Sequence, residues 1–437
     1  MKKNIALFIA GILISGALRV AAQSGNPWTL KDCIDYAFQH HTDVRQALLN
    51  AEMQKEEIKR LKSEAYPVVS AGTDMSYSFD SPLAPGAFTH SWNINARSTL
   101  YQGGALRIER EIALDELRID ELSAGQVREA LALNIARAYL NIVLAGENIS
   151  IAREQLSVSE QLLQKTRDLV EAGVKPRNDL YQAEARVAAD RENLVKAENN
   201  KRLSVLELTR ILQVPSDGFS IRGVDAGFEP APVAYSSGKV VYDFAEKTRP
   251  ELQIARLNIE LSKKSEKRAK AAFYPTVGAV YSLGTNYLYL TQDGLQQSDY
   301  FRQLTDNRGQ SVSLSVSIPV FEGYRNKSTV QKARLRTQMA QYDLEAGKVK
   351  LRTDIEKAYL DAQTSYNSYL AAKANLKAQE EAYRAANERY ELGSMTSYDF
   401  EQVRNNLTRA KSNLVTAKYT YLLHTKILDY YAGKGLQ

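Results

Sequence analysis

The residue types that most often carry chemistry are few and scattered in this chain of 437 residues, which holds four histidines and one cysteine. His40 and His41 are adjacent on a predicted helix, so their imidazoles point to different sides and make a poor metal site. The sequence lacks the spacings of a phosphate-binding loop, a zinc site and a nucleophile elbow. We therefore expect no enzyme activity, no catalytic residue, no cofactor and no metal site.

The single cysteine and the charge balance exclude two further possibilities. Cys33 has no second cysteine to pair with, so no intramolecular disulfide holds the fold. A small apolar residue of the first helix is a simpler role for it than a reactive thiol. The formal net charge of +6 includes three basic residues and no acid among the first 22 residues, which leaves +3 for the remainder. Lys and Arg stand beside Glu and Asp along predicted helices, which is typical of a solvated face and not of nucleic-acid binding.

Residues 1–22 have the pattern of a secretory signal peptide. Lys2 and Lys3 form a short basic segment, an apolar run follows at residues 5–18, and small residues precede a cleavage site after Ala22. That run of 14 residues is too short for a membrane-spanning helix, and no later apolar stretch reaches 18 residues. A membrane β-barrel stays open, because alternating strands leave little trace in mean hydropathy.

The chain contains a long internal repeat. Tyr66-Pro67 resembles Tyr274-Pro275 at an offset of 208 residues, and further on the offset becomes 220. This increase in the offset predicts a longer insertion in the second copy, between Pro275 and Phe321. The pairs at offset 220 are Tyr139 and Tyr359, Gly173 and Gly393, Asp179 and Asp399, and Gln182 and Gln402. We interpret the two copies as residues 23–225 and 226–437, each a medium helix, two strands, a very long helix, a glycine turn and a long helix.

After each Tyr-Pro the hydrophobic period changes to two, which is typical of strands. The clearest run alternates Val312, Leu314, Val316, Ile318 and Val320 with serines and Pro319. We expect two strands within residues 67–101 and two within 275–321, joined by turn-rich loops at 80–89 and 292–310. A soluble sheet with one face on a core would show the same alternation. The signal peptide and the lack of another core partner favour tilted membrane strands with aromatic girdles.

The remaining segments favour helices. Residues 30–64 and 249–272 read as medium helices that end before Pro67 and Pro275. The hairpins span about residues 105–214 and 325–432. Each has a very long helix, 105–172 or 327–392, a break at Gly173 or Gly393, and a second helix, 179–212 or 398–430. Residues 215–240 read as a linker.

Four strands cannot close a membrane barrel, because closed barrels begin at about eight strands and open edges in lipid leave backbone groups unpaired. One subunit must therefore supply a third or a half of a shared barrel. The helical hairpins continue from the same strands, so they would form a second, helical barrel continuous with the first.

This ordered duplication, with Tyr-Pro helix exits and hairpins that turn at a glycine before an aspartate, resembles the TolC-type outer-membrane efflux channels. The resemblance covers nearly all of the chain after residue 22. It implies a mainly α protein with a membrane β-barrel, four strands per subunit in a homotrimeric 12-stranded barrel continuous with a long α-helical periplasmic barrel. It implies a location in the outer membrane of a Gram-negative bacterium, with the helices in the periplasm.

The same resemblance implies a passive exit duct of a tripartite efflux or type I secretion system. Its partners would be a periplasmic adaptor (membrane fusion) protein, an inner-membrane transporter and outer-membrane lipid. A structural coiled-coil envelope protein without a pore is the alternative, but the alternating strands would serve no purpose there. An adaptor protein would have a single hairpin, which the duplication disfavours.

The resemblance also assigns roles at the two hairpin turns. Pore constriction and gating would involve Asp399, Gln402, Asp179 and Tyr390, and adaptor contact would involve Ala172, Gly173, Val174, Leu392, Gly393 and Ser394. Met395 and Gln402 depart from the family pattern of an arginine and a second aspartate. Helix capping explains some of these positions without a gate, since glycines end helices and Asn178, Thr396 and Ser397 are N-cap candidates.

Overall fold

The computed structural model describes residues 27–79, 86–223, 229–290 and 299–434. The predicted signal peptide, residues 1–22, lies outside this range. The chain divides into two units that are interleaved along the sequence. One unit comprises Met1–His41, Glu129–Gly238 and Glu356–Gln437, and the other comprises Thr42–Arg128 and Lys239–Ile355. We name them the hairpin unit and the sheet unit.

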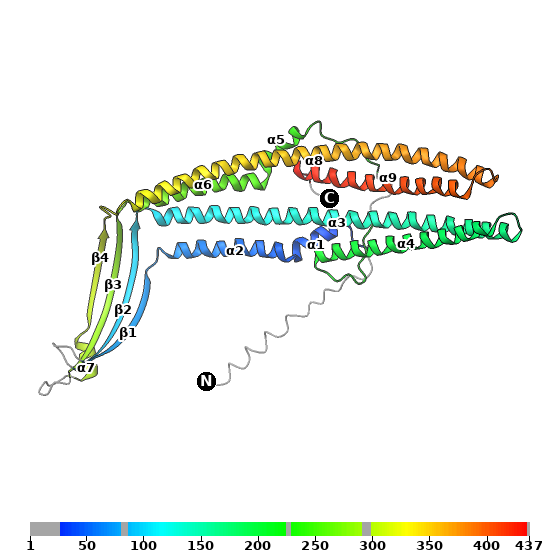
Figure 1. The fold of residues 1–437 in the computed structure, drawn as a ribbon. Coiled ribbons are helices and arrows are strands. Elements are labelled where there is room, and N and C mark those ends of the chain that lie inside the picture. The colour runs from blue at the N-terminus through cyan, green and yellow to red at the C-terminus, as the bar shows by residue number, and fades with distance from the viewer. Residues whose placement is uncertain (1–26, 80–85, 224–228, 291–298, 435–437) are drawn as a thin grey trace. The chain divides into compact units, whose positions relative to one another are not determined.

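The sheet unit contains an antiparallel sheet of four strands in the order β1-β2-β3-β4 (Figure 1). The strands are β1 (Val68–Ser78), β2 (Ala87–Gln102), β3 (Thr276–Leu290) and β4 (Gly309–Ser317). β1 pairs with β2 and β3 pairs with β4, as expected within each copy, and β2 pairs with β3 to join the copies. β1 and β4 are therefore edge strands, each hydrogen-bonded to a neighbour on one side only.

The two faces of this sheet differ as the alternation predicts. Ile94, Leu283, Ala279 and Leu314 belong to one face, by the pairings of β2 with β3 and of β3 with β4. Asn95, Ser282 and Ser311 form a row on the other face. The apolar side chains of β4 are exposed, Val312 to 80% and Leu314 to 67%. An uncovered apolar sheet face of this kind needs a nonaqueous contact.

Two details of the strands differ from the prediction. β4 ends at Ser317, before Ile318 and Val320, because Pro319 has no N–H to continue the ladder. The loop predicted at 292–310 contains a short helix, α7 (Tyr300–Asp306). Gln303 of α7 is hydrogen-bonded through its side-chain amide to both backbone groups of Leu288 in β3. A helix of 7 residues is too short for periodicity to identify. The loop residues 80–85 and 291–298 lie outside the described range.

The first predicted medium helix, 30–64, is in fact two helices, whereas the second, 249–272, is confirmed as one helix that a further helix precedes. Residues 30–64 form α1 (Leu30–His40) and α2 (Thr42–Ser63), separated by the extended residue His41. The second copy has α5 (Gly238–Thr248) and α6 (Pro250–Ala271), separated by the extended residue Arg249. Pro250 explains the second break, because a residue before proline disfavours helical backbone. α5 also shortens the predicted linker, part of which, residues 224–228, lies outside the described range.

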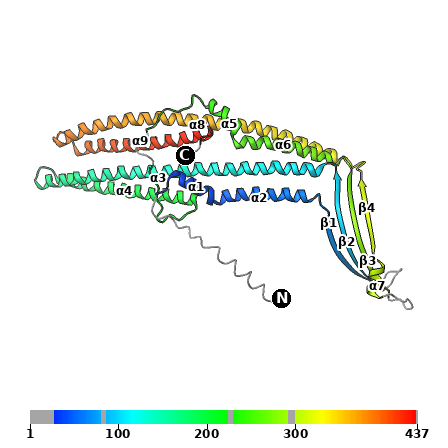
Figure 2. The same ribbon diagram turned by 180° about the vertical axis from the view of Figure 1, so that it is seen from behind.

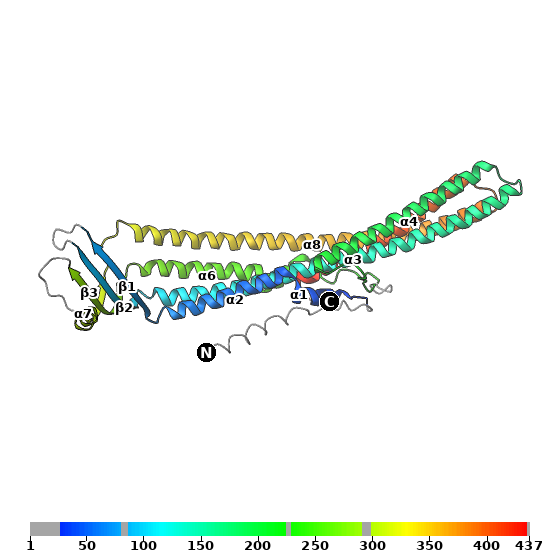
Figure 3. The ribbon, with the colours of Figure 1, turned by 90° about the horizontal axis from the view of Figure 1, so that it is seen from below.

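The long helices agree with the sequence pattern. They are α3 (Ala105–Glu171), α4 (Arg177–Leu212), α8 (Arg325–Glu391) and α9 (Ser397–Tyr431). α3 and α8 have 67 residues each, roughly 100 Å at 1.5 Å per residue. Figures 1 and 3 show α4 returning along the C-terminal part of α3, and Figure 2 shows α9 returning along α8. No helix among the described residues combines the length and apolar character needed to cross a membrane.

The hairpin unit is packed through small and branched side chains. Ile135, Ala138 and Ile142 of α3 are buried in this unit, as is Leu428 of α9. Alanines in such a seam let two helices approach closely, so the unit does not need a wide core. Trp28, near the start of the described residues, is held to this unit, since its backbone N–H donates to the Ser220 carbonyl at 2.9 Å.

Cys33 lies in α1 and is fully buried. The burial of the thiol raises its pKa to about 12. Because a raised pKa keeps the thiol neutral, we expect Cys33 to resist thiol reagents at pH 8, with a thiolate fraction about a thousandfold below that of an exposed cysteine. The rate of modification by Ellman's reagent, with and without denaturant, measures this.

A matched control places an exposed cysteine at the turn, Ser394→Cys in a Cys33→Ala background. That variant should react at once in the native state, whereas the natural chain should react only after denaturation. Rapid modification of native Cys33 would show that α1 opens readily and would contradict the packing described here.

Candidate functional site

The candidate site is the pair of turns at the ends of the two helical hairpins, both in the hairpin unit. α3 ends at Glu171, Gly173 has a φ of +73°, and α4 begins at Arg177. The second turn repeats this geometry, with Gly393 at a φ of +72° between α8 and α9. Beyond each glycine a backbone N–H reaches back into the helix, Val174 to Leu169 at 2.8 Å and Ser394 to Arg389 at 2.9 Å. Left-handed backbone of this kind favours glycine, as the sequence predicts.

The helices that follow these turns begin differently. Thr396 caps α9: its hydroxyl accepts from the Asp399 N–H at 3.1 Å and donates to the Asp399 carboxylate at 2.7 Å. Ser397 is the first residue of α9, so Thr396 alone of the three N-cap candidates has that position. Asn178 lies inside α4, whose N-cap is Pro176, and the expectation that Asn178 caps it was wrong.

Lys175 connects the two turns. Its ammonium donates to the Tyr390 hydroxyl at 3.0 Å and lies 4.6 Å from the centre of the Tyr390 ring. It is also 4.0 Å from the Asp179 carboxylate. Tyr390 in turn stacks on Phe400 of α9, with 4.5 Å between ring centres. The structure therefore brings Tyr390 and Asp179 to one cation. The sequence argument missed Lys175, since no repeat or motif marks it.

The other predicted gate residues lie on α9. Asp399 and Gln402 are both exposed, and they are three residues apart, so they share one side of the helix. Asp399 keeps its place through the Thr396 cap. The residues predicted to contact an adaptor, Ala172, Gly173, Val174, Leu392, Gly393 and Ser394, are all exposed. Leu392 is 84% exposed, so this turn presents a large apolar side chain to solvent.

A buried charged cluster lies behind the turns and holds the two hairpins together. Arg404 of α9 and Asp190 of α4 have side chains only 2% and 1% exposed, with 3.4 Å between nitrogen and oxygen. Arg404 also donates to Ser159 of α3 at 2.8 Å and contacts Glu401 at 2.7 Å. Arg186 reaches both acids, Asp190 at 3.1 Å and Glu401 at 3.3 Å.

Breaking one member of such a buried pair costs about 3–5 kcal/mol, because the other charge is left without a partner. The cluster therefore fixes the distance between the hairpins, while the exposed contact of Lys165 with Glu391 at 3.7 Å contributes much less. The sequence contains part of the signal for this cluster, because the spacing of Arg186 and Asp190 by four residues, and of Glu401 and Arg404 by three, allows an ion pair on each helix. It had no signal that these two pairs meet.

Comparison with known proteins identifies the family of the chain. The family model described as outer membrane efflux protein matches residues 33–213 and 241–433. TolC of Escherichia coli K12 is 24% identical over 435 residues, which cover 97% of this chain and 85% of TolC. The alkaline protease secretion protein AprF of Pseudomonas aeruginosa is 23% identical over 263 residues, 60% of this chain, and the match spans about half of AprF, 53%.

The fold is also found among solved structures. Crystal structures of CusC, studied for its folding and transmembrane channel formation, superpose with a TM-score of 0.79 at 18% identity, covering 93% of this chain and 92% of CusC. Of these relatives, TolC is an outer membrane protein, AprF is a secretion protein, and CusC forms a transmembrane channel. Because the family model matches both halves and most of the chain, this protein belongs to the outer membrane efflux protein family.

Proposed function

We propose that this protein is the outer-membrane channel of a tripartite efflux or type I secretion system, a passive exit duct for substrates driven by an inner-membrane pump. The observation that carries the proposal is the four-stranded sheet, with one exposed apolar face and two edge strands. On this account the chain catalyses no covalent reaction. Its helices extend into the periplasm of a Gram-negative bacterium.

The trimer follows from closure of the sheet. The outer edges of β1 and β4 carry N–H and C=O groups that need partners in lipid. β1 and β4 of neighbouring subunits run antiparallel when the sheets are joined in order, so these edges can pair. Three copies give twelve strands, the number that the family resemblance implies, and each copy has its apolar face toward lipid.

The alternative of a structural coiled-coil protein without a pore does not explain the sheet. Such a protein would gain nothing from a face in which Val312 and Leu314 stand exposed. It would also leave two strand edges open to aggregation. An adaptor protein is disfavoured because the chain has two hairpins of similar length.

The remaining assignments are part of this proposal. Residues 1–22 direct export and are removed, and residues 23–225 and 226–437 are two copies of one structural repeat. The exposed turns contact a periplasmic adaptor protein through Val174, Leu392 and their neighbours. Asp399 and Gln402 line the periplasmic opening, and Lys175 holds Tyr390 and Asp179 together in the closed state.

We expect the purified protein in detergent to have the mass of three chains and to form channels in planar bilayers with a small, flickering conductance. Three chains are expected because closure of the barrel needs three sheets. The conductance is expected to be small because the contacts of Lys175 between the hairpin turns narrow the periplasmic end. Light scattering and single-channel recording measure the two properties. A monomer without conductance would sink the proposal and return the chain to the envelope-scaffold alternative.

Lys175→Met should increase the time that the channel spends open. The variant keeps the length of the side chain but loses the hydrogen bond to Tyr390 and the attraction to Asp179. Partly exposed contacts of this kind contribute up to about 1 kcal/mol, so the open population should rise roughly two- to fivefold per subunit. Single-channel recording of the open fraction measures the effect.

Lys196→Met is the matched control, since Lys196 pairs with Glu192 on the same helix at 2.6 Å and joins no turn. Its open fraction should equal that of the natural chain. Equal open fractions in Lys175→Met and the natural chain would show that Lys175 does not restrain the turns. In the same recordings, Asp399→Ala should alter the conductance, and unchanged currents would remove Asp399 from the pore opening.

A further inference from the structure

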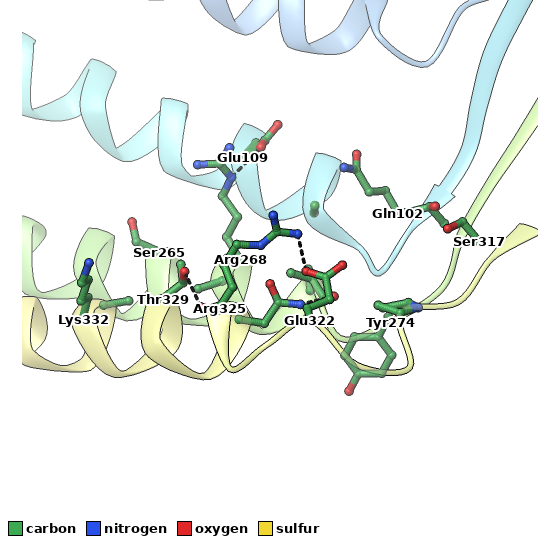
Figure 4. A pocket seen from close by; sticks show the side chains of 18 of the residues that line it. Gln102, Glu109, Ser265, Arg268, Tyr274, Ser317, Glu322, Arg325, Thr329 and Lys332 are labelled. Atoms are coloured by element: carbon green, nitrogen blue, oxygen red, sulfur yellow. Dashed lines mark hydrogen bonds and ion pairs between the residues drawn. The ribbon is translucent and has the colours of Figure 1, made fainter.

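A cavity of about 710 Å³ lies in the sheet unit, where the strands meet the helices (Figure 4). α3, α6 and α8 form its walls, and the strand ends close it at one side. Arg268 stands near its middle in the view, with Glu322 and Tyr274 toward the strands and Lys332 farther along α8. A cavity of this size can hold a small organic molecule.

The lining of this cavity is strongly charged. Four cations, Arg268, Arg325, Lys332 and Arg336, face two acids, Glu109 and Glu322, which leaves a net of two positive charges. Arg268 contacts Glu109 and Arg325 contacts Glu322, each at 2.5 Å. Neither Lys332 nor Arg336 has an acidic partner among the residues that the structure describes. These two side chains are therefore available to an anion.

The spacing along α8 directs these cations to one side. Arg325, Thr329, Lys332 and Arg336 follow one another at intervals of four, three and four residues, which places them on one face of a helix. Lys327 and Arg334 project from the opposite face of α8. Lys327 lies 6.0 Å from the Tyr324 ring centre, and Arg334 is 3.7 Å from Glu266.

The strand residues of the cavity identify which side of the sheet it opens to. Gln102, Thr276 and Ser317 line it, and they are paired in one row across β2, β3 and β4. Thr276 and Ser317 share the alternation of Ser282 and Ser311, so the row belongs to the polar face. In a membrane barrel the apolar face contacts lipid, and the polar face lines the lumen.

We infer that this cavity is an anion site in the wall of the duct, at the point where the strands continue into the helices. The inference rests on the proposed function. In the trimer, three copies form a ring with a net of six positive charges, centred on Lys332 and Arg336. Small organic anions with carboxylate or phosphate groups would be drawn to it and passed along. The cargo class that suits this duct is therefore anionic.

Reversal potentials across a potassium chloride gradient test the site, with about 0.1 M salt so that charges act over about 10 Å. Compared with the natural channel, Lys332→Gln/Arg336→Gln should have a permeability ratio of chloride to potassium lower by about twofold or more. Inorganic pyrophosphate added as a probe should block the natural channel at lower concentration than the variant.

Lys327→Gln/Arg334→Gln is the matched control, because it removes the same charge from the same helix on the side away from the cavity. It should keep the selectivity and the pyrophosphate block of the natural channel. Equal ratios in the natural channel and Lys332→Gln/Arg336→Gln would overturn the anion site, as would an equal shift in the control. If the natural protein forms no channel at all, the proposed function fails rather than this site.

Discussion

Every backbone N–H and C=O that enters lipid needs a hydrogen-bond partner, and β1 and β4 carry such groups along their outer edges. Much of the arrangement is consistent with this constraint. The need for hydrogen-bond partners requires other copies of the chain, and the apolar strand faces must then turn outward to lipid. Closing the sheet into a barrel leaves a lumen inside it. The polar row at Gln102, Thr276 and Ser317 then faces the lumen, next to a cavity lined by cations.

Two of the long helices are shared by the two units of the chain. α3 and α8 are uninterrupted over 67 residues, so they belong to both units of the chain. At their ends, the glycines at 173 and 393 allow left-handed turns, and α4 and α9 return. Behind the turns, the buried contact of Arg404 with Asp190 joins the hairpins firmly, whereas Lys175 joins the turns through partly exposed contacts. A duct that opens and closes needs both features: a rigid region, here around Arg404 and Asp190, and an end held by weaker contacts, here those of Lys175.

The sequence was sufficient for features that repeat or alternate. The long helices, the four strands and the two glycine turns were all predicted, because period, proline and glycine act locally. It was insufficient where a single residue breaks a pattern, as at His41, and where a short helix such as α7 depends on contacts with β3. Lys175, Arg404 and the cavity beside Lys332 were also missed. Each depends on side chains that are distant in sequence, and one unaligned sequence carries no signal for such meetings.

Oxidative cross-linking between β1 and β4 tests the shared barrel most directly. In a Cys33→Ala background, Ser70→Cys would be combined in turn with Ser311→Cys, Ser313→Cys or Ser315→Cys, because the alignment between subunits must be found. All four positions lie on the polar face by strand pairing. In one alignment the account predicts oxidation-dependent bands of two and three chains, since a disulfide needs Cα atoms within about 7 Å. If every combination gave only single chains under oxidation, β1 and β4 would not meet between subunits, and the shared barrel would be contradicted.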